Sequence, residues 1–511
     1  MDQPTRREWV FPMAAALLAL LVRVIRWHQT AAMMNDGPEF IRLAQAIAAG
    51  DWHTALSHPY HPLYPLAIRL AHGFTADWER AAVAVSVIAG AAAVLALYEL
   101  LREGFDARIA ALGAFLLAVQ PVAIELADVQ SDALYLALFL GSASCLLRAY
   151  LRESALHAAL AGVCAGLAYL TRPEGVGTVL VGMGLFGFEL VRRQWDLGRA
   201  LRLALPLGLA AALVMGPYVT QLSIQAGRPT LTAKKSVTHM LGVSEKGARP
   251  EPAVDPLLAA HPELAPLPRG VRPFRDAPAP QGASTLTYAL KQLAGESFRA
   301  LRPEGVLLLA LGLWAARGGI TRRGWLFAAY TALYAVVLFG LAATSDYLSR
   351  RHVLPPATLL FGYEALGVTV IAGWLGRVLR PPALRWAVPL ALVAALGLGK
   401  SLRPDRQDAL PERRAADWVR TEGELGSGES VAAIKRRVGY YASAPFVDLR
   451  QAPHPALLLE FLRREHVRYV IVSAKERDEL LRLTEASPDA LALRHEEALG
   501  KDQAFVYELR G

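Results

Sequence analysis

The chain has 511 residues, of which 54% are hydrophobic and only 19% are charged. A soluble protein usually carries about a quarter charged residues, so this composition excludes an ordinary soluble protein over most of the length. The formal net charge of +9 would suit a nucleic-acid-binding protein, but many of the arginines stand in short loops between apolar segments rather than on one face. We therefore expect the bilayer as a partner and no nucleic acid.

Residues 9–400 alternate long apolar runs with short basic connections, whereas residues 401–511 have the composition of a soluble domain. A membrane-crossing helix needs about 20 apolar residues. The sequence predicts about eleven such helices, at residues 9–27, 81–101, 107–123, 132–150, 156–171, 175–191, 200–222, 303–317, 325–343, 353–376 and 384–400. The segments at 107–123 and 156–171 are short. A tilted, a broken and a partly spanning helix are all compatible with their length.

The basic residues predict the orientation in the membrane. Clusters of arginine precede the first helix and then occupy alternate connections, as at Arg6/Arg7, Arg102/Arg108, Arg148/Arg152, Arg192/Arg193/Arg199, Arg317/Arg322/Arg323 and Arg377/Arg380/Arg385. Positively charged connections stay in the cytoplasm. An odd number of helices then places the N-terminus inside and residues 401–511 outside a plasma (inner) membrane, together with the two longest loops, 28–80 and 223–302.

The outer loops differ in character. Apolar residues at helical spacing predict two short amphipathic helices along the membrane surface, one with Phe40, Leu43, Ala44 and Ile47 and one with Leu63, Leu66, Ala67 and Leu70. Residues 245–283 are rich in proline, which predicts an irregular loop, and Ser284 is a candidate cap for a helix to about Leu301.

The last part of the chain alternates helical and strand-like runs. Helices are predicted near residues 412–421, 455–466 and 475–485, and strands at Val431–Ile434, Tyr469–Ser473 and Ala504–Leu509. The expected fold is therefore an all-α polytopic membrane domain, residues 1–400, followed by a small extracytoplasmic α/β domain, residues 401–511. No catalytic motif stands out in the second domain.

Two acidic clusters fall on the predicted outer side. Asp36 and Glu39 follow the first helix, and Glu125, Asp128 and Asp132 follow the third. Such carboxylates can serve as a general base or as ligands of a divalent metal ion, for which Asp36, Asp132 and Glu125 are the candidates. Helix capping is the alternative for Asp36 and Asp132.

A proline-rich stretch between these clusters carries hydrogen-bonding rings. We expect its prolines to fix the path of the loop, and the rings to position the loop or an acceptor molecule. Zinc binding by the two histidines is a weaker alternative, because two ligands do not make a site. The residues are His58, Tyr60, His61 and Tyr64.

Several arginines lie at the predicted outer ends of helices. Arginine suits phosphate, so these side chains are candidates for binding a lipid-linked phosphate. Anchoring to lipid headgroups is the alternative for each of them. The residues are Arg23, Arg26, Arg172, Arg350 and Arg351.

Taken in chain order, these segments resemble the GT-C superfamily of membrane glycosyltransferases, and within it the protein O-mannosyltransferase and aminoarabinose transferase group. The resemblance rests on the arginine-bearing first helix and the segments Asp36–Phe40, Gly50–Trp52, Pro62–Leu66, Ser131–Tyr135, Gly166–Gly175 and Tyr347–His352, and on a tail with Ala416–Val419 and Arg468–Val472. It spans nearly the whole chain and is specific in order rather than in any one motif.

The resemblance implies transfer of a sugar from a polyprenyl-phosphate-linked donor to a hydroxyl of a glycan, lipid or protein acceptor, with or without a divalent metal ion. It also implies that Asp36 is the general base and that Asp132 occupies the second acidic position. Many members carry an adjacent Asp-Glu pair, whereas here Gly37 and Pro38 separate Asp36 from Glu39, which leaves a shared role for Glu39 open. The alternatives are a transporter or flippase of a lipid-linked intermediate and an inactive scaffold.

Overall fold

The computed structural model describes residues 9–232, 255–264, 274, 285–317, 322–345, 348–379 and 381–510. The chain divides into two compact units. The described residues of the first, the membrane unit, fall within Met1–Trp27, Phe40–His239 and Ala283–Arg403. Those of the second, the C-terminal unit, fall within Pro404–Gly511, His28–Glu39 and Met240–Gly282. The loop that carries Asp36 thus groups with the end of the chain, whereas the sequence predicted a single boundary at residue 400.

Each of the eleven predicted apolar segments is helical. The helices of the membrane unit are α1 (Val10–His28), α2 (Gly37–Ala48), α3 (Trp52–Ser57), α4 (Leu63–Ala71), α5 (Trp78–Leu101), α6 (Ala107–Val119), α7 (Pro121–Glu125), α8 (Asp132–Arg152), α9 (Ala155–Thr171), α10 (Val176–Val191), α11 (Leu197–Ala226), α14 (Thr285–Ala316), α15 (Arg322–Ser345), α16 (Arg350–Thr358), α17 (Phe361–Leu375) and α18 (Leu384–Ser401). The first turn of α2 belongs to the C-terminal unit. In the described part of the chain, seven helices are long and apolar enough to cross a membrane, or eight if α16 and α17 form one bent span. The expectation of a multi-pass membrane protein is confirmed, and the higher count of about eleven crossings stays a prediction.

Two of the predicted helices are broken. The segment 107–123 is interrupted at Gln120, between α6 and α7. Residues 353–376 were expected to form a single helix, but α16 and α17 meet at an angle of 69°. Pro355 and Pro356 lie inside α16. Because proline lacks an N–H group and its ring clashes with the preceding turn, two of them in tandem disfavour one regular helix over this segment. The sequence prediction followed the mainly apolar composition of the segment and missed this break.

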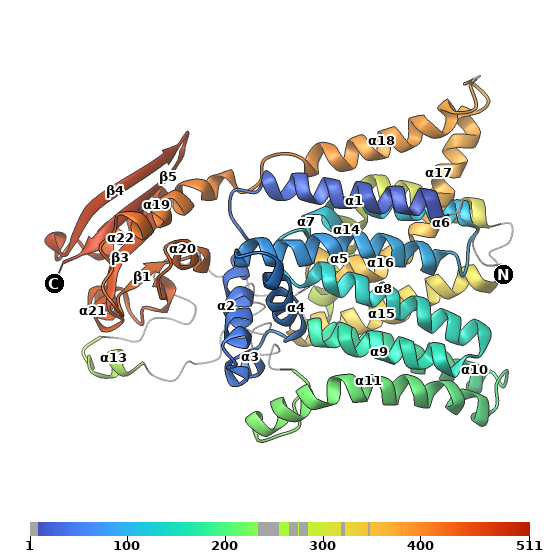
Figure 1. Ribbon diagram of the computed structural model, residues 1–511, viewed down its shortest axis with the longest axis horizontal. Helices are drawn as coiled ribbons and strands as arrows, with labels where there is room; N and C mark the ends of the chain where they lie inside the picture. The colour runs from blue at the N-terminus through green and yellow to red at the C-terminus, as the bar shows by residue number, and fades with distance from the viewer. Residues whose placement is uncertain are drawn as a thin grey trace. The chain divides into compact units, whose positions relative to one another are not determined.

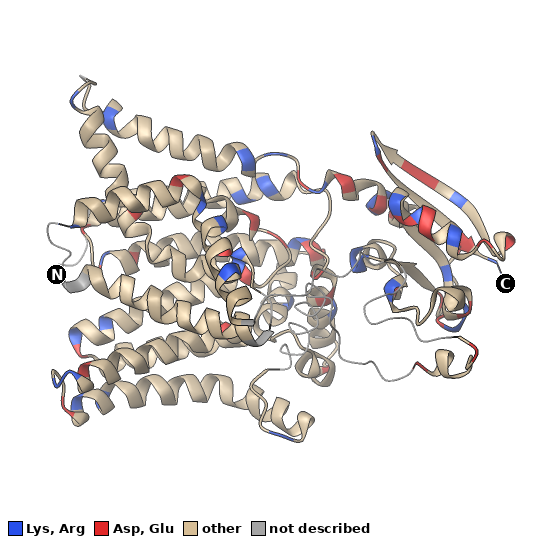
Figure 2. Ribbon diagram, turned by 180° about the vertical axis from the view of Figure 1, so that it is seen from behind, with Lys and Arg blue, Asp and Glu red and all other residues tan. Residues whose placement is uncertain are grey.

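The long helices pack through small residues. Helices α5, α8, α9 and α11 lie side by side in this order (Figure 1). A Cβ atom on Gly162 of α9 would come within 2.3 Å of the Leu207 carbonyl oxygen of α11. Between α14 and α17, a Cβ on Gly312 would come within 1.8 Å of the Tyr363 carbonyl oxygen. Glycine therefore allows these backbones to approach closely, as is common between helices in membranes. Long stretches of the bundle carry no charged residue (Figure 2).

The predicted amphipathic helices of the first outer loop are α2 and α4. The apolar positions predicted for α2 are buried, with Leu43 and Ala44 at 0% exposure. In α4 the buried residues are instead Tyr64, Pro65 and Ile68, and Leu70 is 66% exposed. Most of the proline-rich stretch 245–283, and Ser284, lie outside the described residues. The described piece of that stretch contains the short helix α13 (Pro256–Ala259).

The C-terminal unit contains a five-stranded sheet in the order β2-β1-β3-β5-β4. Strand β1 pairs in parallel with β2 and β3, whereas β5 pairs antiparallel with β3 and β4. Its elements are α19 (Leu410–Thr421), β1 (Ser430–Ala433), α20 (Arg436–Tyr441), β2 (Phe446–Asp448), α21 (Leu458–Arg464), β3 (Val467–Ser473), α22 (Ala474–Leu483), β4 (Leu491–Leu499) and β5 (Asp502–Leu509). The predicted α/β class and the three predicted strands are confirmed.

The sequence missed β2, β4 and α20. Strand β2 has only three residues, too few for a pattern. Strand β4 is an edge strand in which Arg494, Glu496 and Glu497 interrupt the apolar alternation. Charges of this kind are typical of edge strands, because they discourage pairing with other chains.

Candidate functional site

A buried network of charged side chains lies where α8, α9 and α16 begin or end. The Arg172 guanidinium donates a hydrogen bond to Oδ1 of Asp132 and two more, each of 3.3 Å, to the carboxylate of Glu174. Arg172 is the C-cap of α9, and Asp132 is the first residue of α8. Pro173 follows directly, and the residue before a proline avoids the helical conformation. The local sequence therefore ends α9 and turns Arg172 toward Asp132.

Helix α16 adds two cationic side chains to the same carboxylates. Nη1 of Arg351 lies 3.7 Å from Oδ2 of Asp132 and donates a hydrogen bond of 2.8 Å to Oε1 of Gln130. Nε2 of His352 lies 3.4 Å from Oε1 of Glu174. We call Asp132, Arg172, Glu174, Arg351 and His352 the ion network. Two carboxylates face two arginines and a histidine in it, so each carboxylate has at least one arginine or histidine partner.

Arg350, next to the ion network, and Arg351, within it, are more exposed to solvent than Arg172. Nη2 of Arg350 donates a hydrogen bond of 2.6 Å to Oε2 of Glu125. The Arg350 side chain is 41% exposed and that of Arg351 is 26% exposed, compared with 6% for Arg172. Both arginines stand in the first turn of α16, where backbone N–H groups point outward and the helix dipole is positive. Guanidinium groups at a helix N-terminus suit an anion such as a phosphate.

Two further predicted cations, like Arg172, are not accessible. Arg23 is 1% exposed and donates hydrogen bonds of 3.1 Å to the carbonyl oxygens of Ala19 and Ala123. A Cβ on Gly90 would come within 2.4 Å of the Arg23 Nε, so that glycine makes room for the guanidinium. Arg26 is 8% exposed and donates to backbone carbonyl oxygens near the end of α18. A direct contact of either side chain with a lipid phosphate would need a rearrangement, so that role stays a prediction.

The four ring residues of the first outer loop hold elements together. His61 is buried, with Nδ1 2.5 Å from the Tyr169 carbonyl oxygen and Nε2 3.1 Å from the Thr232 hydroxyl. The buried Tyr64 hydroxyl lies 3.0 Å from the Ala82 carbonyl oxygen of α5.

The other two rings act more locally. Tyr60 stacks on Phe40 of α2 with a centroid distance of 4.7 Å, and His58 Nδ1 accepts a hydrogen bond from the Tyr60 N–H. These contacts support the predicted positioning of the loop, and contact with an acceptor stays a prediction.

Asp36 and Glu39 differ sharply in their surroundings within the C-terminal unit. The Asp36 side chain is exposed, and in the described part of the chain no hydrogen bond or ion pair of its carboxylate is recorded. Glu39 is 9% exposed, and its Oε2 lies 3.1 Å from Nη1 of Arg436. Asp36 is thus open to a substrate, whereas Glu39 is held in an ion pair.

The candidate ligands of a divalent metal ion do not meet at one site in the described part of the chain. Among the described residues, no three His, Cys, Asp or Glu side chains are placed to share a metal ion. Asp132 and Glu125 bind arginines, and His58 and His61 each bind other groups. A divalent metal ion therefore finds no assembled ligand set in the described residues.

The sequence did not single out Gln130 or Glu174 as site residues, although they are neighbours of Asp132 and Arg172 in the chain. Polar residues beside a charged one at the end of an apolar segment were the available signal. Their pairing could not be found from the sequence, because the partners come from distant helices.

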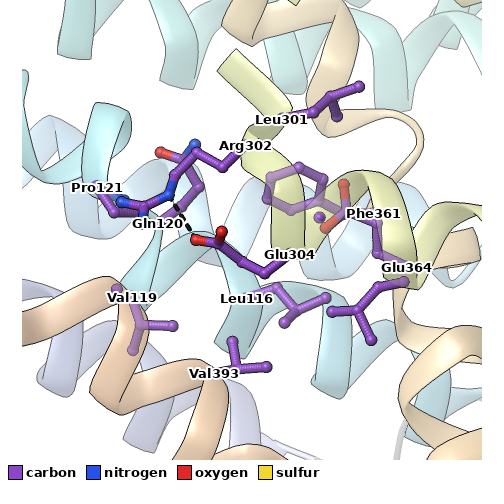
Figure 3. A pocket seen from close by; sticks show the side chains of 13 residues that line it. Leu116, Val119, Gln120, Pro121, Leu301, Arg302, Glu304, Phe361, Glu364 and Val393 are labelled. Atoms are coloured by element: carbon purple, nitrogen blue, oxygen red, sulfur yellow. Dashed lines mark ion pairs between the residues drawn. The ribbon is translucent and has the colours of Figure 1, made fainter. Parts of the chain in front are cut away.

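A small, partly open cavity lies elsewhere in the membrane unit, between α6, α14, α17 and α18. Figure 3 shows Arg302 and Glu304, which form an ion pair of 2.5 Å, beside apolar side chains such as Leu116 and Val393. Glu364 also lines the cavity, is 4% exposed, and has no hydrogen-bond partner for Oε1. None of the residues of the ion network lines this cavity.

Comparisons with known proteins agree with the fold. Residues 57–218 match a family model described as dolichyl-phosphate-mannose-protein mannosyltransferase. No curated protein matches the chain. The crystal structure of ArnT from Cupriavidus metallidurans bound to undecaprenyl phosphate is similar with a TM-score of 0.62 at 14% identity, over 98% of each chain.

Two structures of the oligosaccharyltransferase of Archaeoglobus fulgidus are also similar. The apo form gives a TM-score of 0.54 at 14% identity, and the complex with an inhibitory peptide and a dolichol-phosphate gives 0.51 at 13%. Each alignment covers 98% of this chain and 74% of the archaeal one. The chain therefore has the fold of these proteins over nearly its whole length, and its residues 57–218 match the mannosyltransferase family model.

Proposed function

We propose that the protein transfers a sugar from a polyprenyl-phosphate-linked donor to an acceptor hydroxyl at the outer face of the membrane. The observation that carries this proposal is the pair of accessible arginines, Arg350 and Arg351, in the first turn of α16. An anionic phosphate is the ligand that such a turn suits best. Two of the similar structures are described as bound to undecaprenyl phosphate and to dolichol-phosphate, which supports a donor of this class.

In the proposed reaction the acceptor oxygen forms a bond to the anomeric carbon, and the bond from that carbon to the donor phosphate breaks. The proton of the acceptor hydroxyl passes to the carboxylate of Asp36, which is exposed. The electron pair of the broken bond leaves with the polyprenyl phosphate, whose growing negative charge Arg350 and Arg351 stabilise. A single displacement of this kind inverts the anomeric configuration.

Three predicted site residues take supporting roles in this mechanism. Asp132 and Arg172 are buried and bind each other, so we assign them to fixing Arg351 rather than to contact with the sugar. Glu39 is paired with Arg436 and supports the loop that carries Asp36. A divalent metal ion is not required by this scheme.

Sugar release from a radiolabelled polyprenyl-phosphate-hexose by the purified protein in detergent tests the proposal. Wild-type protein should transfer the labelled sugar to an acceptor. In Asp36→Asn the transfer rate should fall by at least about a hundredfold, in the range typical of the loss of a general base. Asp77→Asn is a matched control, because Asp77 is an exposed N-cap of α5 and asparagine caps as well as aspartate does.

The product distinguishes the remaining alternatives. A product of inverted configuration supports a single displacement, and a retained configuration would contradict it. Binding of the donor without turnover, unaffected by Asp36→Asn, would favour the transporter or flippase.

A further inference from the structure

The loop that carries Asp36 is fastened to the C-terminal unit by its backbone. The N–H of Ala31 donates to the carbonyl oxygen of Asp405, and the N–H of Asp405 donates to that of Gln29, both at 3.0 Å. Thr30 and Asp405 form an isolated parallel bridge. Residues 29–31 thus add a short strand-like contact to the segment that leads into α19.

Three side chains extend this contact to residue 33. Arg406 donates to the carbonyl oxygen of Ala32, and Arg413 of α19 donates to that of Ala31, both at 2.7 Å. The N–H of Met33 donates to the hydroxyl of Tyr441 at 2.9 Å.

Arg413 and Tyr441 also support each other. The Arg413 guanidinium stacks on the Tyr441 ring, 4.5 Å from its centre, an arrangement that is itself favourable. The two side chains therefore act together on residues 31–33.

A second attachment follows after Asp36. Glu39, in the first turn of α2, pairs with Arg436 in the first turn of α20 at 3.1 Å. Asp36 stands three residues from each attachment, at Met33 and at Glu39. Its side chain is exposed although the chain is fixed on both sides of it.

The residues that hold the loop are held in turn. Lys435 and Arg437, on either side of Arg436, bind the two oxygens of Glu412 at 2.6 and 3.2 Å. Glu412 is 5% exposed and lies in α19. The start of α20 is therefore fixed to α19, so Arg436 and Arg413 are carried by one rigid part of the domain.

We propose that the C-terminal unit fixes the position of the Asp36 loop, with Arg413, Tyr441 and Arg436 as positioning residues for the transfer reaction. The proposal rests on the proposed function, because it takes Asp36 as the base. A base works only when it is held within hydrogen-bond distance of the hydroxyl that it deprotonates. A loop that were free to move would spend much of its time elsewhere, which lowers kcat without weakening donor binding.

Hydrogen–deuterium exchange of the full-length protein in detergent tests the attachment without reference to activity. Tyr441→Phe removes one hydroxyl, and Arg413→Ala removes a charged hydrogen bond and the stacking contact. We expect amides of residues 30–36 to exchange roughly tenfold faster in Arg413→Ala, because a hydrogen bond to a charged group is worth about that factor. In Tyr441→Phe the amide of Met33 should be the most affected.

Arg414→Ala is the matched control, because Arg414 is the exposed neighbour of Arg413 on α19, and it should leave exchange unchanged. Faster exchange throughout the sheet in Arg413→Ala and Tyr441→Phe would indicate a role in folding only and would overturn the proposal. Unchanged exchange of residues 30–36 in both variants would overturn it as well.

Kinetics then test the positioning role. Arg436→Ala should lower kcat about tenfold with the donor KM unchanged, and Arg436→Lys, which keeps the charge, should recover part of the loss. A wild-type kcat in Arg436→Ala and Arg413→Ala would overturn the positioning role. A wild-type protein without transfer activity would instead overturn the proposed function, while exchange would still decide whether the loop is attached.

Discussion

Arg172 donates a hydrogen bond to Asp132, and both side chains are buried in the membrane unit. The other oxygen of Asp132 faces Arg351. The Asp132 carboxylate therefore holds two guanidinium groups in place, that of the buried Arg172 and that of the more exposed Arg351. Buried ion pairs lower the energy only while both partners are present, because a remaining single charge is desolvated without compensation. Asp132 therefore links the stability of the membrane unit to the placement of α16.

Asp132→Asn should destabilise the protein. Removing one partner of a buried pair typically costs about 3–5 kcal/mol, and we expect about 2–4 kcal/mol because asparagine keeps one accepting oxygen. Thermal unfolding in detergent, followed by tryptophan fluorescence, measures the change. Asp77→Asn, at an exposed cap, should shift the midpoint little. Equal midpoints for both variants would show that Asp132 does not hold the ion network.

Arg350→Gln should separate binding from stability. The Arg350 side chain is 41% exposed in its pair with Glu125, and exposed ion pairs contribute about 0–1 kcal/mol. The unfolding midpoint should therefore stay near that of the wild type, whereas the donor KM should rise about tenfold through loss of a charge-assisted phosphate contact. Arg385→Gln, in the connection predicted to be cytoplasmic, is the control. A lowered midpoint with an unchanged KM would remove Arg350 from the proposed phosphate site.

The helices and the site differ in how far the sequence reveals them. Apolar runs predicted the helices because burial in lipid depends on local composition, yet the break between α16 and α17 was missed although Pro355 and Pro356 mark it. Asp132, Arg172 and Arg351 were all predicted as site residues, since charges at the ends of apolar segments are costly. Their pairing was not predictable, because each comes from a different helix.

The attachment of the Asp36 loop left no signal in the sequence. Arg413 and Arg406 bind backbone carbonyl oxygens, and a carbonyl oxygen is present at every residue. Tyr441 lies in a helix of only six residues, which no periodic pattern can indicate. The run Lys435-Arg436-Arg437, which binds Glu412 and Glu39 in the structure, was not predicted either.

The attachment of residues 255–264 to the C-terminal unit should depend on pH. Nδ1 of His261 lies 2.8 Å from Glu263 and Nε2 lies 3.0 Å from Glu460 of α21. Hydrogen bonds to Glu263 and Glu460, against a smaller effect of burial, raise the pKa of His261 above its usual 6.5. The stabilisation is thus complete below pH 6.5 and is lost as the pH rises through the raised value.

Hydrogen–deuterium exchange of residues 255–264, corrected for the intrinsic pH dependence, measures this effect. Protection in the wild type should be full below pH 6.5 and should fall as the pH rises above that value, whereas in His261→Gln it should be independent of pH. The neighbouring pair Arg464–Asp255 contains no histidine and is present in both proteins, so it is common to the two profiles. A wild-type profile that matches that of His261→Gln would show that the histidine does not regulate the attachment.

Two glycine substitutions should have opposite signs in the pair α14 and α17. A Cβ on Gly312 would come within 1.8 Å of the Tyr363 carbonyl oxygen, and the nearest atom is backbone, which cannot rotate away. Gly312→Ala should therefore force the helices apart and cost about 1–3 kcal/mol or more. Gly373→Ala, also helical and with nothing within 4 Å of its Cβ, should be neutral or stabilise by up to about 1 kcal/mol, because alanine loses less backbone entropy in a helix. Thermal unfolding of the two variants in detergent gives the comparison, and a Gly312→Ala protein as stable as the wild type would mean that α14 and α17 do not pack through this glycine.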